Sequence, residues 1–241
     1  HTVLINGLGP VGLGAVALAR FLGAEVIGVE PNPWRRDLAE QLGADLTLDP
    51  TASDALAVIR ERTHGEGVHR AIDASGRPEG ERLCIDALRC LGKVAFIGEN
   101  QGTIEFSPSR DGIRRGIEVI ACWHQNLNSF DDLVTFLRRF PDARKLISHT
   151  FGFTQVEQAF STFASAQAAK VILHPWEYRW TCPALPDYDT AATSDCPSAE
   201  RPFGRSGVAA LLLLCVLAAY APTPVRHLPG VPAGPSQGGQ S

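Results

Sequence analysis

The start of the chain decides its fold, and residues 3–12 read VLINGLGPVG. Val3 to Ile5 has the composition of a buried strand, and residues 11–22 form a mostly apolar helical stretch that ends at Gly23. Between strand and helix, the glycines at 7, 9 and 12 follow the spacing G-x-G-x-x-G. A strand, a glycine turn and a helix in this order predict the first half of a βαβ unit, from which parallel sheets are built.

Strand and helix signals alternate in the same way as far as residue 176. We expect further strands at residues 25–29, 46–48, 71–73, 94–97, 118–123 and 171–173. Helices are expected at residues 33–42 with Asn32 as N-cap, 53–63 with Ser53 as N-cap, 79–91, 129–139 with Ser129 as N-cap, and 154–164 with a Thr154 to Glu157 capping box. This pattern predicts an α/β fold with a doubly wound parallel sheet of the Rossmann type.

Each glycine of the motif has a physical reason to be there. Gly7 permits a tight turn, Gly9 lets the backbone approach a pyrophosphate, and Gly12 lets the helix lie close to the sheet. The helix N-terminus, which begins near Val11, supplies free N–H groups and a partial positive charge to the phosphates. The spacing by itself is a weak signal. A turn in a fold that binds no dinucleotide, or that binds S-adenosylmethionine, therefore stays open at this point.

An acidic residue follows the second expected strand. Glu30 lies 18 positions beyond Gly12, where a carboxylate would accept hydrogen bonds from both hydroxyls of an adenosine ribose. The same carboxylate would repel a 2′-phosphate, which favours NAD over NADP. Arg35 and Arg36 follow shortly afterwards, and an arginine here could instead accept that phosphate. NADP therefore remains the alternative cofactor.

Composition excludes several function classes. The chain carries 22 Lys and Arg against 26 Asp and Glu, a formal net charge of −4, so it has no electrostatic footprint for nucleic acid or for an anionic membrane surface. The six cysteines form no C-x-x-C pair and match no zinc pattern. We therefore expect no nucleic-acid partner and no metal site made by these residues.

The composition changes near Trp176. Residues 177–241 are rich in turn-forming residues, and we expect this tail to be of low order apart from a short apolar run at residues 208–221. A helix of these 14 residues would span only about 21 Å, which is too short to cross a bilayer. A membrane anchor is therefore not expected. The run could instead pack on the domain, remain exposed, or be unrelated sequence joined by a frameshift.

Residues 2–176 resemble the cofactor-binding half of the zinc-type medium-chain dehydrogenases, the family of alcohol, sorbitol and threonine dehydrogenases. The resemblance rests on a set of motifs rather than on one. These are GLGPVG at 7–12, VE at 29–30 followed by Arg35, LGAD at 42–45, DASG at 73–76, GKV at 92–94 before Ile97 and Gly98, KLI at 145–147, and KVIL at 170–173. In combination they are specific.

The resemblance implies a role for each part of the site. Residues 7–12 would hold the pyrophosphate, and Glu30 and Arg35 would flank the adenosine ribose. The adenine and ribose side would be lined by Ala74, Ser75 and Gly76, and the nicotinamide would lie near Ile97, Gly98, Glu99, Cys122 and Trp123. Lys170 matches a position where the family often places a basic residue near the phosphates. The implied cofactor is NAD, with NADP as the alternative.

The resemblance also implies a reaction, the transfer of hydride between a small alcohol or polyol and NAD. In the family this needs a zinc ion held by a GroES-like catalytic domain, whose ligands would precede His1. The chain contains no Met and begins with His1 inside a strand, so we expect a fragment that lacks the zinc ligands and catalysis. Cys84 and Cys90 are expected to pack on one helix, and the five histidines at 64, 69, 124, 149 and 174 to be structural or exposed.

We divide the chain into a Rossmann domain at 1–145, a segment at 146–176 that returns toward the missing catalytic domain, and the tail. Without that domain, Phe151, Phe153, Val156 and Phe160 should be exposed. A cytoplasmic protein that forms a homodimer or tetramer through the sheet edge at 118–123 is implied. Two alternatives remain: a zinc-free, NADP-dependent quinone or enoyl reductase, and a non-catalytic dinucleotide-binding module held at a membrane by residues 208–221.

Overall fold

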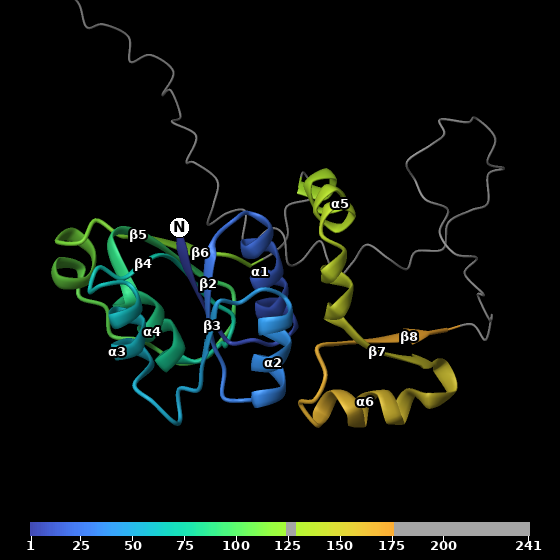
Figure 1. Ribbon diagram of the computed structural model, residues 1–241. Coiled ribbons are helices and arrows are strands. Elements are labelled where there is room, and N and C mark those ends of the chain that lie inside the picture. Colours follow the sequence, from blue (N-terminus) through green and yellow to red (C-terminus); the bar gives the residue numbers. More distant parts are fainter. Residues whose placement is uncertain (124–128, 176–241) are drawn as a thin grey trace, which may run out of the picture.

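The computed structural model describes residues 1–123 and 129–175, and its centre is a six-stranded sheet in which every pair of strands is parallel (Figure 1). The strands lie in the order β3-β2-β1-β4-β5-β6. Their bounds are β1 Thr2–Asn6, β2 Glu25–Val29, β3 Leu46–Leu48, β4 Val68–Asp73, β5 Leu88–Phe96 and β6 Glu118–Ala121. The order reverses between β1 and β4, as in a doubly wound Rossmann sheet. The predicted fold class is confirmed.

Helices cover both faces of this sheet. One face carries α1 (Pro10–Phe21) and α2 (Pro33–Gln41), and the other carries α3 (Ala55–Arg62) and α4 (Pro78–Ala87) (Figure 1). The two cores follow the alternation of β1: Val3 and Ile5 pack with α1 and α2, whereas Leu4 packs with α3 and α4. Because both faces are buried, β1 is a continuous apolar run.

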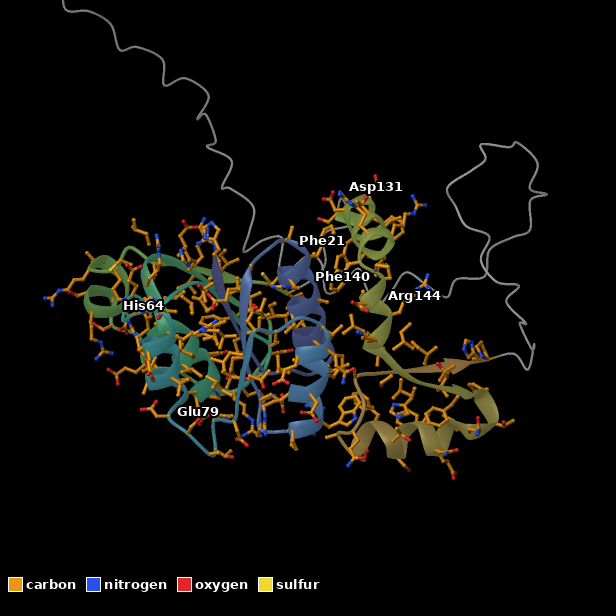
Figure 2. All side chains as sticks on the ribbon, viewed as in Figure 1. Phe21, His64, Glu79, Asp131, Phe140 and Arg144 are labelled. Atoms are coloured by element: carbon orange, nitrogen blue, oxygen red, sulfur yellow. The ribbon has the colours of Figure 1, made fainter. Side chains whose placement is uncertain are left out.

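The chain then adds α5 (Phe130–Arg139) beside α1. The ring of Phe21 at the end of α1 lies 5.3 Å from the ring of Phe136 and 6.3 Å from that of Phe140, in edge-to-face arrangements (Figure 2). A 3₁₀ turn at Pro141–Leu146 follows. The cluster of Phe21, Phe136 and Phe140 therefore joins the C-terminal part of the described chain to the sheet.

The last elements form a small separate layer. Strands β7 (Ile147–Gly152) and β8 (Lys170–His174) pair in parallel, with a 3₁₀ turn at Phe153–Gln155 and helix α6 (Val156–Ala164) between them. We call residues 141–174 the return unit. Its side chains Ala143, Leu146 and Ala169 belong to the same core as α1 and α2, and the unit lies beside α2 in Figure 1. Strand β7 is not among the strands expected from the sequence.

The exposure of the return unit is confirmed at two of the four predicted positions. Phe153 is 61% exposed and Phe160 69%. The prediction is wrong for Phe151 and Val156, which are half-buried because β7 and α6 cover one another. The division of the chain at residue 145 stays a prediction.

The predicted helix at 79–91 is wrong at its end. Helix α4 stops at Ala87, and Leu88, in an extended conformation, already begins β5. The guanidinium of Arg115 donates hydrogen bonds to the carbonyls of Ile85 and Leu88, which satisfies groups that the helix end leaves free. A side chain distant in sequence therefore stabilises the end of this helix. Cys90, expected to pack on the helix, is an exposed residue of β5.

Two of the predicted helix caps are wrong. Asp54, and not Ser53, caps α3, because its carboxylate accepts a hydrogen bond from Ala57 N at 3.1 Å. The capping box from Thr154 to Glu157 is replaced by a 3₁₀ turn in which the Gln155 side chain accepts from Gly152 N at 3.1 Å.

Other boundaries agree more closely. Asn32 caps α2 as expected. Ser129 occupies the cap position of α5, although its side chain makes no capping hydrogen bond. The strand expected to reach Trp123 ends at Ala121.

Residues 176–241 lie outside the described part of the chain, and with them the predictions for the tail and for the apolar run at 208–221. His124 is also outside it. Among the residues that the structure describes, no helix is long and apolar enough to cross a membrane.

Candidate nucleotide-binding site

Three loops meet at the carboxyl end of the sheet, after β1, β4 and β5. Gly7, with a φ of +85°, leaves so little room that an added Cβ would lie 2.6 Å from Ser75 Cα. An added Cβ on Gly98 would lie 2.2 Å from Gly76 N. The structure therefore brings together the predicted site residues of all three loops. They lie where the strand order reverses, which is where open parallel sheets bind their ligands.

The glycine loop leaves the first turn of α1 open. An added Cβ on Gly12 would lie 1.8 Å from Gly7 O, so this glycine lets α1 approach the turn, as predicted. Gly9 is the N-cap of α1, and no side chain caps the helix there. An added Cβ on Gly9 would meet nothing within 4 Å. The first N–H groups of a helix have no partner within it, and here no side chain caps them, so they are available to bind phosphate oxygens.

Glu30 lies directly after β2 and is only 5% exposed. One carboxylate oxygen accepts a hydrogen bond from Leu8 N at 2.8 Å, and the other accepts from Asn32 N at 3.1 Å. Arg35 Nη1 lies 3.8 Å from this second oxygen. Glu30 therefore links the glycine loop to the start of α2. The position of Glu30 after β2 follows from the sequence, whereas its contact with Leu8 N does not.

The two arginines of α2 differ in their surroundings. Arg36 donates to the carbonyls of Glu30 at 2.7 Å and Pro31 at 2.8 Å, and to the Asp49 carboxylate at 3.2 Å. Its guanidinium is thus engaged with the chain itself. Arg35 stands closer to the Glu30 carboxylate, and its buried Nε has no hydrogen-bond partner in the structure. A buried donor without a partner is unusual and fits a site that a ligand would complete.

Asp73, which is not among the site residues predicted from the sequence, organises the other two loops. Its side chain is fully buried and accepts hydrogen bonds from Asn6 Nδ2 at 2.8 Å, Ser75 Oγ at 2.7 Å and Gly76 N at 3.2 Å. Its carbonyl accepts from Ile97 N at 2.9 Å and Gly98 N at 3.0 Å. Asp73 therefore fixes the loop after β4 against the ends of β1 and β5. The signal in the sequence was a charged residue that ends an apolar strand.

The remaining predicted residues are distributed around this centre. Ala74 N donates to Asn6 O at 2.8 Å, and Glu99 O would lie 2.6 Å from a Cβ added to Gly76. Cys122 N donates to Phe96 O at 3.0 Å, which places the end of β6 beside that of β5. Trp123 is 71% exposed. Lys170 is the first residue of β8, in the return unit and outside the six-stranded sheet.

Two titratable groups on α4 lie beneath the loops. Burial raises the pKa of the Glu81 carboxyl, and the nearby Asp73 acts in the same direction, whereas a hydrogen bond from Asn100 opposes them. Burial also raises the pKa of the Cys84 thiol well above its ordinary value. Cys84 is therefore a neutral packing residue, as predicted, because only the thiolate is a good metal ligand or nucleophile.

Within residues 1–123 and 129–175, no group of three or more His, Cys, Asp or Glu side chains is arranged to hold a metal ion. A zinc ion, which the family resemblance implies, has no fitting ligand set in this part of the chain. A dinucleotide fits better. The open helix N-terminus, the buried Glu30 and the unpartnered Arg35 Nε are features that its pyrophosphate and ribose would complete.

Comparison with known proteins agrees with this geometry. The family model described as zinc-binding dehydrogenase matches residues 10–139. L-Threonine 3-dehydrogenase of Symbiobacterium thermophilum is 31% identical over 179 residues, which cover 73% of this chain and 51% of that protein. A zinc-type alcohol dehydrogenase-like protein of Escherichia coli is 34% identical over 177 residues, covering 71% and 49%.

Solved structures show the same relationship. An alcohol dehydrogenase of Thermotoga maritima superposes with a TM-score of 0.67 at 30% identity, covering 72% of this chain and 49% of that one. The 2R,3R-butanediol dehydrogenase of Bacillus subtilis has a TM-score of 0.67 at 25% identity, covering 72% and 50%. The chain spans about half the length of the relatives it matches. The family match runs from α1 through α5 and includes the five strands β2 to β6, and this chain therefore belongs to the zinc-type medium-chain dehydrogenase family.

Proposed function

We propose that this chain binds NAD(H) at the carboxyl end of its parallel sheet, as the cofactor-binding part of an oxidoreductase. The observation that carries the proposal is the meeting of the open N-terminus of α1 with the buried carboxylate of Glu30, at the point where the strand order reverses. A helix N-terminus suits a pyrophosphate, and a carboxylate directly after the second strand suits ribose hydroxyls.

Each group of the site has a part in this proposal. The first turn of α1 at Pro10 and Val11 binds the pyrophosphate, with Lys170 as a further basic group near it. Glu30 accepts from the adenosine ribose, and Arg35 lies against the same sugar with its free Nε. Ala74, Ser75 and Gly76 line the adenine and ribose, while Ile97, Gly98 and Glu99 lie near the nicotinamide. When bound, the nicotinamide supplies the carbon that accepts or donates hydride.

The surroundings of the arginines support NAD over NADP. A 2′-phosphate would meet the carboxylate of Glu30, which has little access to water that could screen it. Arg36, which could have offset this charge, is held by Glu30 O, Pro31 O and Asp49. Of the two arginines, this leaves only Arg35 to face the ribose. Its Nη1 already lies 3.8 Å from the Glu30 carboxylate, which offsets its charge toward a 2′-phosphate.

The whole enzyme, of which this chain matches about half, would oxidise a small alcohol or polyol reversibly to a carbonyl compound. We propose a cytoplasmic homodimer or tetramer for it, with the zinc ligands on a catalytic domain outside this chain. Taken alone, the chain should bind the cofactor weakly and show no dehydrogenase activity.

Titration of the purified full chain with NADH, followed by nicotinamide fluorescence, tests this proposal. We expect saturable binding of NADH and weaker binding of NADPH, and no binding at millimolar NADH would refute the proposal. Glu30→Gln keeps an oxygen that can accept from Leu8 N but removes the charge, so it should narrow the difference between NADH and NADPH. Glu61→Gln, an exposed change on α3, is the matched control. Tighter binding of NADPH by the unmodified chain would support the reductase alternative.

A further inference from the structure

Asn32 makes hydrogen bonds in three directions. Its backbone N–H donates to the Glu30 carboxylate at 3.1 Å, and its side-chain oxygen accepts from Arg35 N at 3.4 Å. Its side-chain Nδ2 donates to the carbonyl of Ala166 at 2.8 Å, across 134 positions of sequence. Two of these partners are the residues that would flank the adenosine ribose. The third belongs to the return unit.

The Ala166 carbonyl is part of a fixed turn rather than of a loose surface segment. Ala166 has a φ of +59°, and its N–H donates to Phe163 O at 3.2 Å. The following residues anchor the turn, because Ala168 and Ala169 are fully buried and Ala169 N donates to Ser148 Oγ at 3.0 Å. Ala169 also packs in the core that contains α1 and α2. The acceptor for Asn32 is therefore held in place beside the start of α2.

Helix capping alone does not require asparagine here. Ser, Thr and Asp also cap helices through a side-chain oxygen. An ionised Asp carries no donor, and the hydroxyl of Ser or Thr ends one bond short of the position of Asn32 Nδ2, too far from Ala166 O to donate while it caps the helix. The asparagine amide has one acceptor and two donor hydrogens, so it can cap α2 and hold the turn together.

We propose that Asn32 is a positioning residue that couples the turn between α6 and β8 to recognition of the adenosine ribose. The bond to Ala166 fixes the Asn32 side chain, whose oxygen sets the start of α2 at Arg35. Its backbone N–H in turn orients the Glu30 carboxylate. The return unit is thus part of the cofactor site through Asn32, although none of its residues need touch the ribose. This inference rests on the proposed binding of NAD(H).

The test compares substitutions that all retain a helix cap. In Asn32→Ser, the new side chain is neutral and can accept a hydrogen bond from the backbone of α2, but it is too short to reach Ala166 O. We expect it to raise the Kd for NADH about five-fold, the effect of losing one hydrogen bond that orders a site. The Kd for NADPH should change less, because Glu30 discriminates against that cofactor. The Kd for NADPH divided by the Kd for NADH should therefore fall. Asn32→Thr serves in its place if Asn32→Ser does not fold.

The matched control is Asp54→Ser at the cap of α3, which has the same type of capping contact and lies on the other face of the sheet. It should leave both Kd values unchanged, even where it lowers the thermal midpoint as much as the Asn32 variant does. A purely structural role of Asn32 would give a lower midpoint with an unchanged NADH to NADPH ratio, and that result would overturn the inference.

Hydrogen exchange supplies a second measurement on the same proteins. If the two regions are coupled, NADH should slow amide exchange at residues 163–170 in the unmodified chain and in Asp54→Ser, and not in Asn32→Ser. Failure of the unmodified chain to bind NADH would count against the proposed function. If the unmodified chain binds NADH and Asn32→Ser has the same Kd for NADH, the same ratio of Kd values and the same hydrogen exchange, the coupling is refuted and the proposed function is not.

Discussion

The six-stranded sheet and the return unit bury their apolar residues to very different extents. In β1, Val3, Leu4 and Ile5 are all 0% exposed, because helices cover both faces. In the return unit, Ile147 is 53% exposed, Phe160 69% and Phe163 49%. Two strands and one helix are too few to enclose a core of their own. The return unit therefore packs on α1 and α2 and still leaves apolar surface exposed, and we propose that a catalytic domain covers this surface.

The difference also separates two kinds of contribution to function. The sheet supplies the groups that would touch the cofactor, at loops fixed by close backbone contacts such as that of Gly12 with Gly7 O. The return unit contributes through Ala166, whose carbonyl accepts a hydrogen bond from Asn32, and through Lys170, which we propose lies near the phosphates. Four substitutions, each paired with a control, measure how far this contrast holds.

The largest contrast should come from truncating one apolar side chain in each region. Leu4→Ala should lower the free energy of unfolding by about 2–5 kcal/mol, because it removes a fully buried side chain and leaves a cavity. Phe160→Ala, at 69% exposure, should change it by less than about 0.5 kcal/mol. Urea denaturation measures both. Equal losses would show that the return unit is covered as well as the sheet is.

A smaller loss is expected from adding a methyl group to the glycine loop. Gly12→Ala places a Cβ against Gly7 O and should cost about 1–3 kcal/mol and abolish NADH binding. Gly9→Ala should fold with nearly unchanged stability, because its Cβ meets nothing within 4 Å. Denaturation and NADH fluorescence separate the two effects. A stable Gly12→Ala variant that binds NADH normally would contradict the role given to this glycine.

Acid should weaken the sheet through a carboxylate near its edge. Hydrogen bonds from Arg110, from Ser107 N and from Arg82 lower the pKa of Asp111 below its usual range. Since the folded pKa is below the unfolded value of about 3.9, this stabilisation is complete above that pH and is lost as the pH falls. Asp111→Asn should therefore lower the urea midpoint at pH 7 and flatten its decline below pH 4.

The return unit provides the comparison for this titration. Asp142 is an exposed carboxylate paired with Lys145 at 3.0 Å. Exposed ion pairs of this kind contribute little to the free energy of unfolding, so Asp142→Asn should leave the pH dependence of the urea midpoint unchanged. If both substitutions changed the urea midpoint equally, the contacts of Asp111 would stabilise the fold no more than an exposed ion pair does.

The smallest effect should be a gain. Ala166 has a φ of +59°, a conformation that costs a residue with a Cβ, and Ala166→Gly should stabilise the return unit by roughly 0.5–1 kcal/mol. His64→Gly, at a φ of +53° in the sheet region, is the matched change. Hydrogen exchange should show slower opening near β8 only for Ala166→Gly. Slower exchange throughout the chain would indicate that the two regions unfold together.

Much of the architecture was predictable because it depends on local patterns. The apolar run at Val3 to Ile5 and the glycine spacing fixed the first βαβ unit, and Asn32 was recognised as a cap from its position before Pro33. The errors have a common cause. Residues 79–91 have helical character throughout, but Arg115 stabilises the helix end near Leu88 from 27 positions away.

The site divides in the same way. The sequence placed Glu30 and the three loops at the ends of their strands, because parallel strands carry their carboxyl ends to one edge. It did not reveal Asp73, whose role depends on Asn6 Nδ2, 67 positions earlier. Nor did it distinguish Arg35 from Arg36, since only the packing shows which guanidinium is already engaged.

The sequence by itself determined the order of strands and helices in the six-stranded sheet, the glycine loop and the position of an acidic residue after β2. These features repeat at short intervals, and periodicity and turn chemistry are properties of neighbouring residues. Only the tertiary structure decided that the return unit packs on α1 and α2 and that Asn32 binds Ala166 O across 134 positions. Such contacts leave no periodic trace, because each depends on two segments being brought together by the burial of the core between them.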